Sequence, residues 1–99
     1  VPRPAASMDR AEQLFADGRF ASALAEARAV LEAEPGNSEA RQLAEDAQVE
    51  LVVDQRLKEA RSALAAGDRD RARAALQRGL DVKPTDSRLV ALRKQIAGE

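Results

Sequence analysis

The chain repeats itself once without a gap, and this repeat restricts its fold more than any other feature. Residues 11–50 align on residues 60–99 at an offset of 49. Apart from Glu50/Glu99, the identical positions are small residues, turn formers and a few apolar residues: Ala11/Ala60, Ala16/Ala65, Gly18/Gly67, Ala23/Ala72, Ala25/Ala74, Leu31/Leu80, Pro35/Pro84, Ser38/Ser87 and Leu43/Leu92. Such self-similarity is typical of proteins that stack copies of one supersecondary unit. The sequence therefore predicts two copies of one unit.

The first copy predicts two helices joined by a tight turn. Ser7 is the expected N-cap of a helix that starts at about residue 7 or 8 and ends at about residue 17. Gly18 follows it, because Gly tolerates the left-handed conformation that ends a helix. A second helix is expected over about 20–33, where apolar residues recur at helical spacing. The run at 35–38, Pro-Gly-Asn-Ser, ends that helix and caps the next.

A long helix is expected to join the two copies. Residues 38–66 hold no Gly or Pro and are rich in strong helix formers. The apolar stripe shifts its frame at 51–53, as expected of a helix that packs one unit with its first half and another with its second. A break near 53–54 is the alternative. Gly67 is expected to end this helix, and Asp68 to cap the following one.

The second copy predicts two further helices. One covers about 69–82 and carries Gly79 in its interior. Because Gly in a helix interior costs about 1 kcal/mol relative to Ala, its presence indicates a close helix crossing. After a break at the second proline turn, a last helix covers 87–97, with Asp86 or Ser87 as its cap.

These spacings resemble the tetratricopeptide repeat (TPR), a unit of about 34 residues. The family places a small residue in its first helix, Gly at the turn, a large residue two positions later, and then Ala and Pro at fixed distances. The matching residues are Ala11, Gly18, Phe20, Ala23 and Pro35 in the first copy and Ala60, Gly67, Ala72 and Pro84 in the second. The resemblance covers about 4–37 and 53–86, and each unit is followed by a further helix.

The resemblance implies an all-α fold of about five helices. It would be a fragment of a right-handed α-solenoid, built from TPR-like helical hairpins that share the long central helix 38–66. A linker at 1–6 would precede a single domain over 7–99, closed by a capping helix at 87–97. The usual Trp and Tyr of the family are missing, and the period is 49, so the two units are degenerate. A generic Ala-rich helical bundle is the alternative.

The composition excludes most chemistry. There is no Cys, His, Trp or Tyr, so a thiol nucleophile, a Ser-His-Asp triad and a Cys/His zinc site are impossible. No Gly-rich phosphate loop is present. We therefore expect no enzyme, no cofactor and no metal. A net charge of -1 and the lack of aromatic stacking platforms argue against nucleic-acid binding. No apolar run approaches the roughly 20 residues that span a bilayer, so direct membrane insertion is not expected.

The origin of the chain is suggested only by its composition. Thirteen Arg against three Lys, with 22 Ala, are typical of a GC-rich bacterial genome. The chain begins without Met, which suggests a piece of a longer protein, and a cytoplasmic or a periplasmic location fits equally. Only 21 residues are Leu, Ile, Val or Phe. We expect Ala to supply the packing at close helix crossings.

The resemblance also implies a function, because the concave face of such repeats takes up peptides or partner helices. The expected function is a non-enzymatic protein–protein interaction module, a scaffold or adaptor. The groove positions of the family correspond here to Met8, Glu12 and Phe15 in the first unit and to Leu57, Lys58, Arg61 and Leu64 in the second. Lys58 and Arg61 would suit an acidic partner, with plain solvation of these charges as the alternative.

The halves of the chain carry opposite charge. Residues 1–50 hold five basic and ten acidic residues, a balance of -5, whereas residues 51–99 hold eleven and seven, a balance of +4. Ordinary solvated helix faces are one explanation. The other is a dipolar surface that orients a partner or a second copy of the chain. Self-association into a homo-oligomer is therefore the alternative function.

Overall fold

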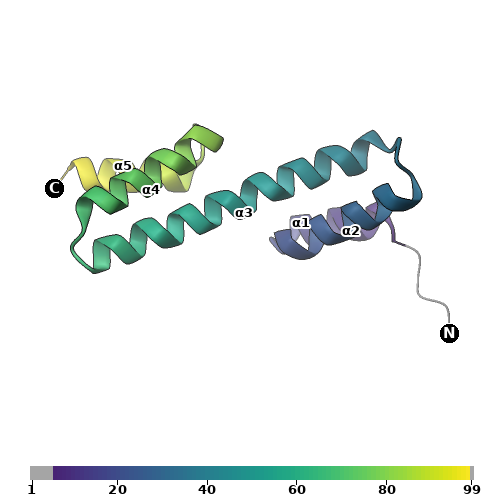
Figure 1. The fold of residues 1–99 in the computed structure, drawn as a ribbon, viewed down its shortest axis with the longest axis horizontal. Coiled ribbons are helices and arrows are strands. Elements are labelled where there is room, and N and C mark those ends of the chain that lie inside the picture. Colours follow the sequence, from purple (N-terminus) through teal and green to yellow (C-terminus); the bar gives the residue numbers. More distant parts are fainter. Residues whose placement is uncertain (1–5, 99) are drawn as a thin grey trace. The chain divides into compact units, whose positions relative to one another are not determined.

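The computed structural model describes residues 6–98, and its regular structure there is entirely α-helical (Figure 1). The predicted all-α class is thus confirmed. The expected linker at 1–6 lies, apart from Ala6, outside the described residues. The helices are α1 (Met8–Ala16), α2 (Phe20–Ala33), α3 (Ser38–Ala65), α4 (Arg69–Val82) and α5 (Ser87–Ala97).

The chain divides into two compact units between Leu51 and Val52. Helix α3 runs through this boundary as one helix, so the break considered near residues 53–54 is not observed. Its first part belongs to unit 1 and its second part to unit 2. The boundary coincides with the frame shift in the apolar stripe at 51–53.

Unit 1 is built on an α1–α2 hairpin (Figure 1). Its interior is mainly alanine: the residues with no exposed area are Ala11, Ala23, Ala27, Ala40 and Ala47. Leu24 and Val30 add larger buried side chains from α2. The short side chains allow the helix backbones to approach closely, as ridge-into-groove packing permits when contact residues are small.

Local capping defines the ends of the helices in unit 1. The Ser7 Oγ accepts a hydrogen bond from the Arg10 N–H at 3.1 Å, as expected of an N-cap. Gly18 has a φ of +79°, the left-handed conformation predicted for it. At the next turn the Asn37 Oδ1 accepts from the Ala40 N–H at 3.0 Å. This side chain therefore starts α3 and satisfies one of its free N–H groups.

Unit 2 contains the second part of α3 together with α4 and α5, and its tightest point is Gly79. A methyl group placed on Gly79 would lie 3.0 Å from both Leu89 methyl carbons of α5 and 3.3 Å from the Arg56 Cβ of α3. The close helix crossing expected at Gly79 is thus confirmed. Leu89 itself has no exposed area. A side chain at this crossing would require Leu89 or Arg56 to shift by a few tenths of an ångström.

Asp86 anchors α5 to the rest of unit 2. It is the N-cap of α5, and its carboxylate accepts from the N–H groups of Arg88 at 3.0 Å and Leu89 at 3.1 Å. The structure therefore selects Asp86 over Ser87 as the cap. The Arg88 guanidinium joins the Asp86 carboxylate at 3.1 Å to Asp54 of α3 at 2.8 Å. The Asp86 side chain is only 5% exposed, whereas those of Arg88 and Asp54 are 39% and 37% exposed, so the Arg88–Asp86 pair is the more shielded of the two.

Substituting Gly79 tests the crossing. Gly79→Ala adds helix propensity worth about 1 kcal/mol, but it also overpacks a site whose neighbour Leu89 has no exposed area, at a cost of about 1–3 kcal/mol. We expect a net loss of about 1 kcal/mol in the free energy of unfolding, measured by urea denaturation. In a Leu89→Ala background, where space is available, the same change should stabilise the protein.

Ala74→Gly on the exposed face of α4 is the matched control, because it reports helix propensity without any packing change. It should cost about 1 kcal/mol. If Gly79→Ala instead raises the free energy of unfolding of the otherwise unchanged protein, the helices at Gly79 are packed less closely than the 3.0 Å distance to Leu89 indicates.

The Asp86 carboxyl predicts an acid-sensitive stability. Burial raises its pKa. Hydrogen bonds from Arg88 and Leu89 and the nearby positive charges outweigh burial, so the pKa lies below its ordinary value of 3.8. A group with a lowered folded-state pKa stabilises the protein fully above its ordinary pKa, and this contribution is lost as pH falls through the folded value. Asp86→Asn should therefore cost about 1–2 kcal/mol at neutral pH.

The measurement is urea unfolding of both proteins, followed by circular dichroism, between about pH 7 and about pH 2. The difference between wild type and Asp86→Asn should shrink as the pH falls below 3.8. A difference that stays constant over the whole range would contradict this assignment.

Candidate functional site

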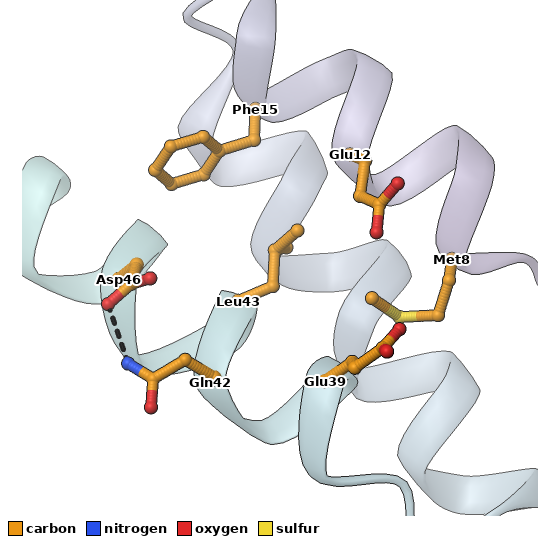
Figure 2. Close-up of a pocket in the computed structure, with 7 residues that line it drawn as sticks. All are labelled: Met8, Glu12, Phe15, Glu39, Gln42, Leu43 and Asp46. Carbon is orange, nitrogen blue, oxygen red and sulfur yellow. Dashed lines mark hydrogen bonds between the residues drawn. The ribbon is translucent and has the colours of Figure 1, made fainter.

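A groove lies between α1 and the first turns of α3 in unit 1, and we name it the α1–α3 groove (Figure 2). Its cavity has a volume of about 280 Å³. The lining residues from α1 are spaced four and three apart, and those from α3 three, one and three apart, so each set lies on one helix face. The lining is Met8, Glu12 and Phe15 of α1 with Glu39, Gln42, Leu43 and Asp46 of α3.

The groove contains large apolar side chains that the core does not cover. Met8, Phe15 and Leu43 are each only partly buried. The Phe15 ring packs edge-to-face on Phe20, with ring centroids 5.1 Å apart and planes at 72°. This contact holds the Phe15 ring in one orientation, since edge-to-face pairs are a preferred aromatic geometry. The groove thus presents a preformed apolar surface.

The rim of the groove is negatively charged. Glu12, Glu39 and Asp46 are all exposed, and no Lys or Arg is among the lining residues. Within residues 6–98 none of the three carboxylates has an ion-pair partner. Asp46 accepts a hydrogen bond from the Gln42 side-chain amide at 2.9 Å (Figure 2). The site therefore combines an apolar floor with an anionic rim.

The structure brings together the three site residues predicted in the first unit, Met8, Glu12 and Phe15. It also adds a second wall that the sequence interpretation did not include. Leu43 is one of the repeated apolar residues of the chain, and residues at helical spacing from it share its helix face. That periodicity indicates which residues lie together on α3. It does not reveal that this face meets α1, because that contact depends on tertiary packing.

The four predicted residues of the second unit have different environments. Leu57 is only 3% exposed and belongs to the core of unit 2. Leu64 is partly buried. Lys58 and Arg61 are exposed on α3. We therefore assign Leu57 a packing role, and only the two charged residues and part of Leu64 are accessible to a partner.

A second hollow, between α4 and α5 in unit 2, has the opposite charge. Its volume is about 320 Å³. The charged residues that line it are Arg73 and Arg93, and no carboxylate contributes. Three of its apolar lining residues, Leu76, Leu80 and Ile96, are 3–6% exposed, whereas Ala97 is exposed. This α4–α5 hollow therefore differs from the α1–α3 groove in the charge of its lining.

The described residues hold no candidate metal centre and no candidate membrane span. Among the described residues, no three His, Cys, Asp or Glu side chains are placed to share a metal ion. In the same part of the chain, none of the helices has the length and apolar character needed to cross a bilayer. Comparison with family models, curated proteins and solved structures gives no match. The functional interpretation therefore rests on the geometry of the groove.

Met8 offers a direct test of whether the groove is open. It is the single Met of the chain, so its oxidation to the sulfoxide adds one oxygen at one known place. Because Met8 is partly exposed, we expect hydrogen peroxide to oxidise it in the folded protein within about tenfold of the rate in urea. Mass spectrometry measures both rates. Protection of about 100-fold or more in the folded protein would mean that the groove is closed.

Proposed function

We propose that this chain is a TPR-like, non-enzymatic interaction module that acts as a scaffold or adaptor within a larger protein. Its α1–α3 groove binds a peptide or a helix of a partner protein. The observation that carries this proposal is the set of three large apolar side chains, Met8, Phe15 and Leu43, that remain partly open in a groove between two helices.

Energetics support this choice of site. Burying a large apolar side chain stabilises a complex by roughly 1.5–3 kcal/mol, and this chain has only 21 Leu, Ile, Val and Phe residues for its own core. Leaving three large apolar groups partly uncovered in one place is therefore costly unless a partner covers them. The volume of about 280 Å³ is near the lower end of ligand pockets, about 300 Å³, and suits inserted side chains.

The repeat supports the family part of the proposal. In TPR units the first helices of successive hairpins line the groove that takes up peptides. The spacing of Gly18, Ala23 and Pro35 makes α1 the first helix of such a hairpin. The start of α3 then takes the place of the first helix of the next hairpin. We propose a right-handed solenoid arrangement on the same basis.

Selection from a displayed library of random peptides tests the proposal. The wild-type chain should enrich peptides that bind it directly, and Leu43→Arg, which puts a long charged side chain into the groove, should weaken them by about tenfold or more. Gln48→Arg is the matched control, since it adds the same charge at an exposed site on α3 outside the groove. Peptides that bind Leu43→Arg as well as wild type would place binding elsewhere.

Self-association is the second candidate, and the opposite charges of the two halves, -5 and +4, favour it. Sedimentation equilibrium separates the two functions. A self-associating chain would exceed its mass of 10.6 kDa at low salt and return to it at high salt, where screening weakens charge contacts. A monomer at both salt concentrations would remove this candidate.

A further inference from the structure

We infer that the partner segment of the α1–α3 groove is cationic, with an apolar anchor residue flanked by Lys or Arg. This inference rests on the proposed function and names the chemical class of the partner. This cationic partner differs from the acidic partner that Lys58 and Arg61 would suit, because those two residues belong to unit 2. The groove itself is lined by three carboxylates and no cation.

The placement of the carboxylates is the first argument. Glu12 comes from α1, whereas Glu39 and Asp46 come from α3, so both walls of the groove are negative. Figure 2 shows Glu12 and Glu39 directed into the space between the two helices. Like charges gathered at one site repel each other, and a cationic segment lying between them relieves this repulsion. An apolar anchor on Leu43 would bring flanking cations to carboxylates on both sides.

The aromatic ring is the second argument. The edge-to-face contact with Phe20 holds Phe15 in place, yet Phe15 remains partly exposed. The face of an aromatic ring attracts the ammonium of Lys and the guanidinium of Arg. A preoriented ring also loses little conformational entropy when a partner packs on it. A neutral or acidic segment gains no cation–π attraction from this ring.

The α4–α5 hollow supplies an internal comparison. It is lined by Arg73 and Arg93 and by no carboxylate. A cationic segment is repelled there. Binding of a cationic peptide is thus expected in unit 1 only, although the chain as a whole has a net charge of just -1.

The test uses fluorescently labelled helical peptides of about 12 residues, long enough to exceed the roughly 14 Å of α1. One peptide carries Leu at helical spacing with Lys at the other positions. Two counterparts replace every Lys by Gln or by Glu. Fluorescence anisotropy should show that the chain binds the Lys peptide at least about tenfold more tightly than either counterpart, and that raising the salt concentration weakens this binding.

Charge-reversal variants then test whether the Lys peptide binds in the α1–α3 groove. The double variant Glu12→Lys/Asp46→Lys should lower the affinity for the Lys peptide by about 30-fold, which corresponds to about 1 kcal/mol for each reversed charge. Glu32→Lys with Glu45→Lys changes the net charge equally at exposed positions outside the groove, and it should change the affinity by less than about threefold. Bound Lys peptide should also slow the oxidation of Met8, and circular dichroism confirms that both variants fold.

Each other outcome overturns the inference. If the control pair weakens binding as much as the groove pair, the attraction is non-specific. If the Gln peptide binds as tightly as the Lys peptide and Leu43→Arg abolishes both, the groove binds a partner but charge does not select it. If the Glu12→Lys/Asp46→Lys pair instead converts a sedimenting oligomer to a monomer, the occupant is a second copy of the chain. The proposed function itself fails only if library selection yields no groove-dependent peptide.

Discussion

Among the described residues, alanine supplies nine of the eighteen buried apolar side chains, and the close approach of the helices depends on it. Five alanines with no exposed area lie in unit 1, and Ala60 and Ala72 are equally buried in unit 2. A methyl side chain lets two backbones approach closely, so dispersion contacts come from the backbone as well as from side chains. At Gly79 even a methyl group would press on Leu89. A low share of large apolar residues is therefore compatible with a packed interior.

Such packing requires that the helix ends be placed accurately. Gly18 and Gly67 adopt the same φ of +79° at equivalent turns of the two copies, so each hairpin reverses in the same way. Asp68 caps α4 through the Arg71 N–H at 3.0 Å. Asp86 does more than cap α5, because its partner Arg88 also bonds Asp54 of α3. Polar groups thus set the positions of helices that have little side-chain surface to align them.

Because large apolar side chains are few in this chain, those that remain partly exposed bear on its function. Met8, Phe15 and Leu43 lie together in one groove. The opposite net charges of the two halves of the chain also correspond to two particular surfaces. Carboxylates line the α1–α3 groove, and arginines line the α4–α5 hollow. A difference in net charge thereby becomes a difference between two surfaces with different expected partners.

Local features were predictable from the sequence because they depend on a few neighbouring residues. A glycine that must adopt positive φ, a serine or aspartate that bonds a free N–H, and a proline that cannot continue a helix act within one turn. Gly18, Ser7 and the Pro84 turn accordingly mark helix ends where expected. The close crossing at Gly79 was also foreseeable, since an interior glycine is unfavourable unless something requires it.

The meeting of helix faces was decided by the tertiary structure alone. Leu43 and Leu57 both belong to apolar runs at helical spacing, on either side of the frame shift at 51–53, yet Leu57 is buried and Leu43 is partly open in the groove. The acidic wall of α3 at Glu39 and Asp46 became part of a site only because it faces α1. Burial depends on residues distant in the chain, and several packings satisfy the same helical pattern. The sequence by itself determined the helices and their ends, whereas side-chain packing determined which surfaces were left for a partner.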